Sequence, residues 1–276
     1  MLYEIAIANI IEVEEEANEG IAIGLLNIAD DQIRIGELDA AESNLKRSLD
    51  ICREITDEHD EAIGHQELGL LYTYLGKFKE SEKELGKARE SFILLGQVQS
   101  LCVVWRHHTI LSFLRSNAEE AILFAKMARE LADIYMYERD IIGAEYLLGA
   151  AHFIKGNFVE AEKHLTDALT CDRKINLVEL EPDILLEFAR LRFKQNHKKE
   201  ALKFAEEALQ IADRCEYRLK QTDVLNFLAE FYLDAGDLEK AKKHGEIAKE
   251  RAECGYKPAL EKAEKLLDKV KFNKMN

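Results

Sequence analysis

A forty-residue period constrains the fold of this sequence more than any other feature. Residues 68–78 read Leu-Gly-x-x-Tyr and then Gly-Lys-Phe, and closely similar phrases begin at residues 148 and 228. Intermediate copies lie forty residues from each of them. Self-similarity at a fixed period of about 20–50 residues is typical of stacked repeats, in which each unit buries its apolar face against its neighbours.

Three positions of each repeat carry small side chains, as close packing between helices requires. They are Ala29, Gly69, Thr109, Gly149, Ala189 and Ala229; Ala41, Ser81, Ala121, Ala161, Ala201 and Ala241; and Ser48, Ala88, Ala128, Ala168, Ala208 and Ala248. Between the first two positions lie Gly36, Gly76, Ser116, Gly156, Asn196 and Gly236. Gly and Asn adopt the left-handed conformation that ends helices. Each repeat is therefore predicted to be a helical hairpin, and six unbroken steps favour a solenoid over a bundle with accidental register.

Composition supports an all-α fold. The 276 residues include two prolines and are rich in Ala, Leu, Glu and Lys, which are strong helix formers. Pro182 and Pro258 are each expected to open a helix, where the missing N–H costs nothing. The segment 259–272 has Leu and Ala on one face and Lys or Glu on the other, as a capping helix needs.

These phrases resemble tetratricopeptide repeats, whose pattern is W-x2-L-G-x2-Y followed by Ala, an aromatic residue or Leu, and Ala. The resemblance covers residues 22–255. It implies a right-handed α-α superhelix of about six hairpins with capping helices. Trp105 occupies the Trp position of the third repeat, but His108 and Thr109 replace Leu-Gly there. We therefore expect the first helix of that repeat to be the least regular.

The register divides the chain into an N-terminal helix at 1–20, six repeats within 21–256, and a capping helix with a tail at 257–276. The repeats are assigned to residues 22–61, 62–101, 102–141, 142–181, 182–221 and 222–256. Extended backwards, the register places Ile5 and Ala8 at second-helix positions of a repeat whose first helix would precede Met1. The N-terminal helix is thus either a simple cap or half of a repeat in the tail of a longer protein.

Residues 51–63, 213–221, 226–229 and 256–264 also resemble the forty-residue repeats at the C-termini of prokaryotic signal-transduction ATPases of the STAND or NB-ARC-like type. This narrower resemblance implies a sensor or docking arm. The ATPase itself is not implied, because the sequence lacks the GxxxxGK[ST] phosphate-binding loop. Gly64 and Gly69 have the glycine spacing, but Leu70 and Leu71 follow them.

The net charge and the cysteine spacing indicate which partners and which cellular compartment to expect. A net charge of −15 disfavours phosphate backbones and anionic lipid, so neither nucleic acid nor a membrane is expected. The acidic N-terminus does not resemble a signal peptide, which leads us to expect a cytoplasmic protein. The five cysteines lie about forty or more residues apart without a CxxC pair, so reduced thiols are expected. The oligomeric state does not follow from the sequence.

No catalytic motif accompanies the repeats. No two histidines are separated by three or four residues, which excludes HExxH, and no serine lies in GxSxG. The adjacent His107 and His108 point about 100° apart on a helix, so we expect one to pack and the other to face the groove. We accordingly predict neither catalytic residues nor a metal or cofactor, and a chain that is not an enzyme.

In tetratricopeptide folds the first helix of each hairpin lines the concave surface, which defines the candidate binding residues. They are Gln66, Leu70, Tyr74, Arg106, Ile110, Phe113, Tyr146, Phe153, Arg190, Phe193, Asn226 and Glu230. Aromatic and arginine side chains dominate interface energetics, so this surface suits an apolar peptide that carries an acidic group. Alternatively, some of the aromatic rings pack between adjacent helices.

The resulting hypothesis is a non-enzymatic module that binds a protein or peptide in its concave groove. Two alternatives stay open, namely the regulatory arm of a signal-transduction ATPase and a peptide-sensing regulator of the long-helix repeat type. Under the first hypothesis, replacing Arg106 and Arg190 with Ala is expected to weaken ligand binding and to leave the fold intact.

Overall fold

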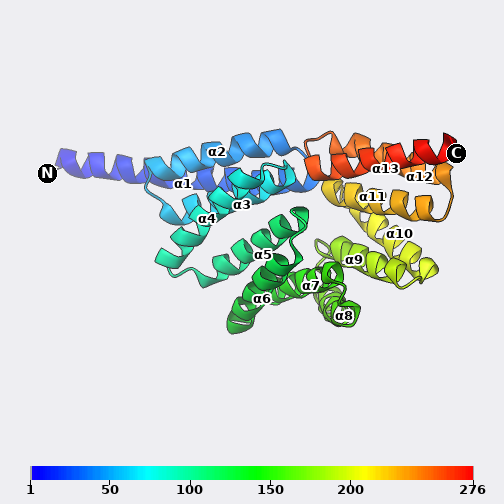
Figure 1. Ribbon diagram of the computed structural model, residues 1–276. Coiled ribbons are helices and arrows are strands. Elements are labelled where there is room, and N and C mark those ends of the chain that lie inside the picture. The colour runs from blue at the N-terminus through cyan, green and yellow to red at the C-terminus, as the bar shows by residue number, and fades with distance from the viewer. Residues whose placement is uncertain (1, 276) are drawn as a thin grey trace.

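The computed structural model describes the backbone of residues 2–275 and the side chains of residues 14 and 16–274, and this part of the chain is entirely helices and turns (Figure 1). Thirteen helices pack in consecutive pairs, which confirms the predicted all-α helical repeat. The first helices of the pairs and the last helix are α1 (Leu2–Ile35), α3 (Glu58–Tyr74), α5 (Val98–Leu114), α7 (Glu138–Lys155), α9 (Glu181–Lys194), α11 (Arg218–Asp234) and α13 (Lys257–Met275). Their partners are α2 (Leu38–Glu54), α4 (Phe78–Leu94), α6 (Ala118–Tyr135), α8 (Phe158–Ile175), α10 (Lys198–Arg214) and α12 (Leu238–Ala252).

Left-handed residues end the helices at regular steps along the chain. All six turn positions expected within the hairpins have positive φ, including Ser116 at 59° and Asn196 at 64°. A second set, which the sequence analysis missed, lies between the hairpins and comprises Thr56, Gly96, Met136, Asn176, Glu216 and Gly255. Because residues other than Gly and Asn rarely adopt positive φ, side chains such as Thr56 and Glu216 do not mark these turns in the sequence.

The N-terminal helix and the first repeat are not separated by a turn. Helix α1 is continuous from Leu2 to Ile35, so the expected segment 1–20 and the first helix of the hairpin form one element. The side chains of Ile5 and Ala8 lie outside the described residues. The repeat boundaries stay a prediction. Helices α3, α5, α7 and α11 begin at residues 58, 98, 138 and 218, each shortly before the predicted boundary.

The eighteen small side chains lie where neighbouring helices cross, and all are buried. A Cβ atom added to Gly69 would lie 2.6 Å from the side chain of Leu85, and one added to Gly149 would lie 2.6 Å from Leu165. Both distances are shorter than van der Waals contact. The forty-residue pattern therefore records the close approach of the two helices in each hairpin.

The expectation of an irregular third hairpin was wrong. Helix α5 is continuous over 17 residues, and α9, with 14 residues, is the shortest of the helices described. Thr109 fits the small position because its hydroxyl group donates to the carbonyl of Trp105 at 2.8 Å. His108 packs against the rings of Trp105 and Phe124, which also stack on each other. Helix α9 is short because turn residues precede it and Pro182, which has no N–H, lies in its first turn.

The C-terminal helix α13 packs against the last hairpin of the stack. It begins at Lys257, directly before Pro258, and contacts α11 and α12. Ala259, Ala263, Leu266 and Val270 are buried on the face turned toward the repeats. Burial of this apolar stripe closes the open end of the last hairpin.

The stack curls until its two ends meet. Helix α1 contacts α11, and α11 to α13 return to the C-terminal end of α1 in Figure 1. One apolar cluster joins residues far apart in the sequence, with Ile33 and Leu38 near the N-terminus and Leu219, Tyr256 and Ala259 near the C-terminus. The odd-numbered helices α1 to α11 consequently surround a central space.

Candidate binding cavity

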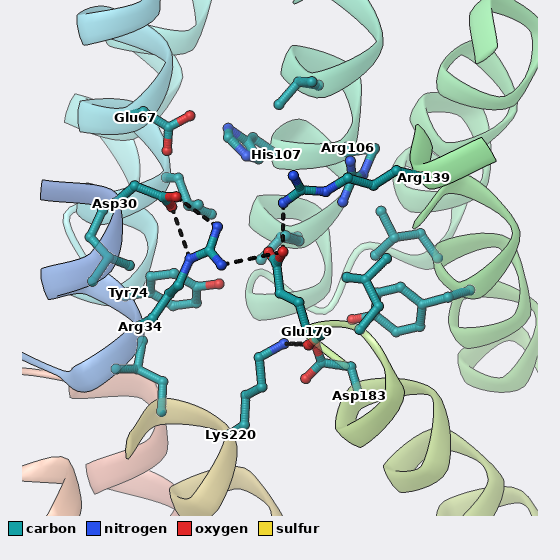
Figure 2. A pocket seen from close by; sticks show the side chains of 18 of the residues that line it. Asp30, Arg34, Glu67, Tyr74, Arg106, His107, Arg139, Glu179, Asp183 and Lys220 are labelled. Atoms are coloured by element: carbon teal, nitrogen blue, oxygen red, sulfur yellow. Dashed lines mark hydrogen bonds and ion pairs between the residues drawn. The ribbon is translucent and has the colours of Figure 1, made fainter. Parts of the chain in front are cut away.

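A cavity of about 720 Å³ lies inside the ring and is lined from α1, α3, α5, α7, α9 and α11 (Figure 2). Further lining residues come from the turn before α9 and from Tyr256, next to α13. The volume lies within the range of about 300–1,000 Å³ that is typical of ligand pockets. The first helices of the hairpins therefore line this space, as the register predicted.

Eight of the twelve candidate binding residues line the cavity. They are Gln66, Leu70, Tyr74, Arg106, Ile110, Phe113, Tyr146 and Arg190. The other four are absent from its described lining. Two of these, Phe153 and Phe193, pack within the stack, where Phe193 lies 5.9 Å from Phe227 and 5.6 Å from Phe231 between ring centroids. For them, packing between adjacent helices is the observed role.

Helix α13 explains why the candidate site does not extend to the last hairpin. The side chain of Asn226 is fully buried, and its Nδ2 donates to the carbonyl of Ala259 in α13 at 3.0 Å. Glu230 forms an ion pair with Lys262 of α13 at 3.3 Å. The capping helix thus occupies the surface that the sequence analysis assigned to a ligand at these two positions.

Both candidate arginines are already paired with carboxylates. The Nη1 atom of Arg106 lies 3.1 Å from Oδ1 of Asp140, and the guanidinium of Arg190 is paired with Glu187 one turn earlier on α9. Gly143 lets Arg106 lie against α7, because an added Cβ would approach its guanidinium carbon to 2.6 Å. The two arginines therefore form ion pairs within the cavity wall. These pairs argue against the acidic ligand that the sequence analysis expected them to bind.

Glu179 joins three parts of the ring across the cavity (Figure 2). Its carboxylate lies 3.3 Å from Arg34 of α1 and 2.5 Å from Arg139 of α7. Its backbone carbonyl accepts a hydrogen bond at 2.8 Å from Nζ of Lys220 on α11, and the same ammonium pairs with Asp183 of α9. Sequence analysis missed Glu179 because it lies in the turn before α9, outside the helical register.

Carboxyl groups outnumber basic groups in the cavity. Of the described lining residues, eight bear a carboxyl group and five bear a basic one. All five arginine and lysine groups form the ion pairs already described, whereas Glu67, Asp223 and the exposed Glu138 form none among the residues that the structure describes. An unfilled cavity of this charge favours a cationic group over an anionic one.

Burial shifts the titration of Glu67 and Asp223. It raises the pKa of Glu67 to about 7, with a further increase from the nearby charge of Asp30. Burial also raises the pKa of Asp223 to about 6, although Arg190 and a 3.0 Å hydrogen bond from the Tyr256 hydroxyl favour its ionised form. Each negative charge is thus partly compensated, that of Asp223 by Arg190 and Tyr256 and that of Glu67 by Gln66, Arg34 and Arg106.

The adjacent histidines have different surroundings. Both are buried, but His107 lines the cavity and His108 packs against Trp105 and Phe124. Burial lowers the pKa of His107 to about 3 and that of His108 to about 4, so both rings are neutral at physiological pH. Across the described part of the chain, no three His, Cys, Asp or Glu side chains are arranged to hold a metal ion.

None of the described helices is both long and apolar enough to cross a membrane.

The sequence of residues 20–93 matches the tetratricopeptide repeat family. No curated protein matches the chain. Solved structures with a similar fold include a Rap protein complexed with Competence and Sporulation Factor, with 14% identity over 86% of this chain and 78% of that one and a TM-score of 0.61. They also include PilF of Pseudomonas aeruginosa, with 16% identity over 85% and 93% of the two chains and a TM-score of 0.50.

A third similar structure is a STAND protein with a tetratricopeptide repeat sensor from Pyrococcus horikoshii. It is 17% identical over 98% of this chain, which spans 44% of that protein, and the TM-score is 0.55. At these identities the similarity establishes the fold alone. The chain is thus an all-helical repeat protein with a tetratricopeptide repeat sequence at residues 20–93.

Proposed function

We propose that this tetratricopeptide repeat chain binds a segment of another protein, or a free peptide, in the cavity enclosed by its odd-numbered helices. The cavity itself is the observation that carries the proposal, because it combines about 720 Å³ of space with apolar, aromatic and charged walls from six helices. Pockets of this kind bury the apolar parts of a ligand and orient it through a few polar groups. The repeat family is one whose members bind proteins and peptides, and the similar Rap structure contains a bound factor.

The second candidate is a sensor arm, in which the same binding event regulates a signal-transduction ATPase in this chain or in a neighbouring one. The similarity to the STAND sensor over 98% of this chain favours it. Genomic evidence that the reading frame continues upstream of Met1 into a nucleotide-binding domain would support this candidate. A peptide-sensing regulator of the long-helix type is a third possibility, and it uses the same cavity.

A peptide selection with a cavity-filling variant tests the proposal. Leu70 lines the cavity and is half-buried, so Leu70→Trp places a large ring in the binding space. Leu123 is 54% exposed on α6 and is not among the cavity-lining residues, so Leu123→Trp is the matched control. Phage-displayed peptides are selected on the wild-type protein, and synthetic versions are then titrated against all three proteins.

We expect the selected peptides to bind wild type and Leu123→Trp alike and to lose at least about tenfold in affinity for Leu70→Trp, equivalent to about 1.4 kcal/mol. Thermal melts check that both variants are folded. Selection of no peptide, or of peptides that bind Leu70→Trp as tightly as wild type, would contradict binding in the cavity.

A further inference from the structure

One wall of the cavity carries hydrogen-bond acceptors that the protein leaves unused. Gln66 of α3 is 6% exposed, and its Nε2 donates to Oε1 of the adjacent Glu67 at 2.7 Å. Its Oε1 atom has no hydrogen-bond partner in the described part of the chain. A buried polar atom without a partner costs about 1–3 kcal/mol, so such atoms in native proteins require an explanation.

His107 of α5 adds a second unused acceptor on the same wall. Its side chain is 8% exposed, and its ring hydrogen-bonds to the backbone of Gln66. No described residue hydrogen-bonds to Nδ1, so the bond to Gln66 comes from Nε2. Because burial keeps the ring neutral, Nδ1 retains a lone pair that can accept a hydrogen bond.

The Glu67 carboxyl group completes the cluster. Two basic side chains influence its titration, and both are engaged elsewhere, since Arg34 pairs with Asp30 and Arg106 pairs with Asp140. In Figure 2, Glu67 and His107 lie at the end of the cavity away from Asp183 and Lys220. At this end of the cavity the unpartnered acceptors outnumber the unpartnered donor, which is Nε of Arg106.

A metal ion does not fit this donor set. Among the described residues no group of three His, Cys, Asp or Glu side chains could hold one, and the Gln66 amide is a weak ligand compared with carboxylate. An anionic ligand would meet the Glu67 and Asp30 carboxylates. An ammonium or guanidinium group, by contrast, supplies several N–H donors and one positive charge.

We propose that Gln66 Oε1, His107 Nδ1 and the Glu67 carboxylate together bind the cationic end of a lysine or arginine side chain of the bound peptide. This inference rests on the proposed peptide binding in the cavity and names one chemical feature of the ligand. It replaces the acidic ligand expected from the sequence with a basic one. Leu70 and Ile110, which line the cavity on α3 and α5, offer apolar surface to the aliphatic part of the side chain.

A double-mutant cycle between protein and peptide tests this pairing. In a cavity-dependent peptide from the selection, each basic residue is replaced in turn by norleucine, which keeps the aliphatic chain and removes the charge. The parent peptide and each norleucine peptide are titrated against wild type, Glu67→Gln and Asp223→Asn. The last variant is the matched control, because Asp223 is another cavity carboxyl group with a raised pKa but lies on α11, apart from Gln66, Glu67 and His107 on α3 and α5.

We expect one norleucine substitution to weaken binding to wild type and Asp223→Asn about tenfold or more, because a charge-assisted hydrogen bond is lost. The same norleucine substitution should change the affinity for Glu67→Gln little, because that variant lacks the carboxylate. Equal losses in all three proteins, a loss that disappears with Asp223→Asn instead, or selected peptides without a basic residue would overturn the cation site. Each of these outcomes leaves peptide binding in the cavity intact.

A small probe tests the cation site even if the selection yields no peptide. N-acetyl-lysine amide is titrated into the ¹³C,¹⁵N-labelled full chain, and the side-chain signals of His107 and Gln66 are followed by NMR. We expect saturable shifts that are absent with the Nε-acetylated compound and strongly reduced in Glu67→Gln. Equal shifts with the neutral compound, or no saturable shift, would overturn the inference.

Discussion

At the scale of single residues, the spacing of helices in each hairpin depends on side chains of at most a few atoms. Ala161 is fully buried where α7 and α8 cross, and its backbone oxygen would lie 3.2 Å from a Cβ added to Gly149. There is no room for a larger side chain at such a contact. These positions could be predicted from the sequence because the requirement recurs every forty residues.

Replacing Ala161 with Leu should therefore destabilise the fold by overpacking, at a cost of about 1–3 kcal/mol. Urea denaturation followed by circular dichroism measures the change in the free energy of unfolding. Val159→Leu is the control on the same helix, since Val159 is 81% exposed. A variant as stable as wild type would contradict the assigned helix crossing.

Asp172 is a buried carboxyl group that the repeat pattern does not explain. It is 1% exposed, and both of its carboxyl oxygens lack hydrogen-bond partners in the part of the chain that is described. Burial raises its pKa from 3.8 to about 7, and the charges of Glu181 and Asp183 add to this shift. The folded state thus binds this proton more tightly than the unfolded state does.

The stability of the wild type should consequently fall as pH rises from about 4 to 7, since ionisation of Asp172 favours unfolding. Asp172→Asn removes this ionisation, so its advantage over wild type should be larger at pH 8 than at pH 5, by about 1–3 kcal/mol. Melting temperatures at both values measure the difference, with the exposed Asp167→Asn as control. A difference that does not change with pH would show that Asp172 is not destabilised by burial.

At the scale of helices and turns, regular spacing made half of the turns predictable. The six turns within hairpins carry Gly, Ser or Asn, and the structure gives each a positive φ. The turns between hairpins include Thr56, Met136 and Glu216, whose side chains give no local signal for that conformation. There the geometry is imposed by packing of the flanking helices.

The contact between the last hairpin and α13 could not be predicted from the sequence either. The register predicted that Asn226 lies on the concave face, but in the structure α13 covers it and it donates to the carbonyl of Ala259. Asn226→Ala should remove this buried hydrogen bond between α11 and α13 and cost about 0.5–1.5 kcal/mol. Amide exchange in α13 should accelerate, as hydrogen–deuterium exchange mass spectrometry can measure.

Glu230→Gln is the matched control for this contact. Its ion pair with Lys262 joins the same two helices, but the two side chains are 47% and 41% exposed. Exposed pairs contribute about 0–1 kcal/mol. Equal effects of the two substitutions would contradict a special role for the buried amide.

At the scale of the whole molecule, closure of the ring determines which surface a ligand can reach. Curvature of a solenoid is the sum of small rotations between repeats, and no local pattern encodes that sum. The sequence therefore predicted eight cavity residues through the register of the first helices but gave no indication that the ends would meet. Glu67 was overlooked because acidic side chains on helices are usually solvated.

Apolar contacts should hold the ring closed more strongly than its ion pairs do. Leu219 is 6% exposed in the cluster that joins the two ends, and truncation of a buried leucine costs about 2–5 kcal/mol. Leu219→Ala should thus increase the radius of gyration measured by small-angle X-ray scattering. Glu179→Gln, which weakens partly exposed ion pairs with Arg34 and Arg139, should change it little. A larger increase in the radius of gyration for Glu179→Gln than for Leu219→Ala would show that ion pairs close the ring.

The most direct test of the account locates a bound peptide on the protein. A selected peptide that carries a photoreactive benzoylphenylalanine is cross-linked to the wild-type chain, and the products are mapped by mass spectrometry. The account predicts cross-links to the cavity-lining residues of α3, α5, α7 and α9, and their loss in Leu70→Trp. Cross-links concentrated on the even-numbered helices, and unchanged in that variant, would contradict it.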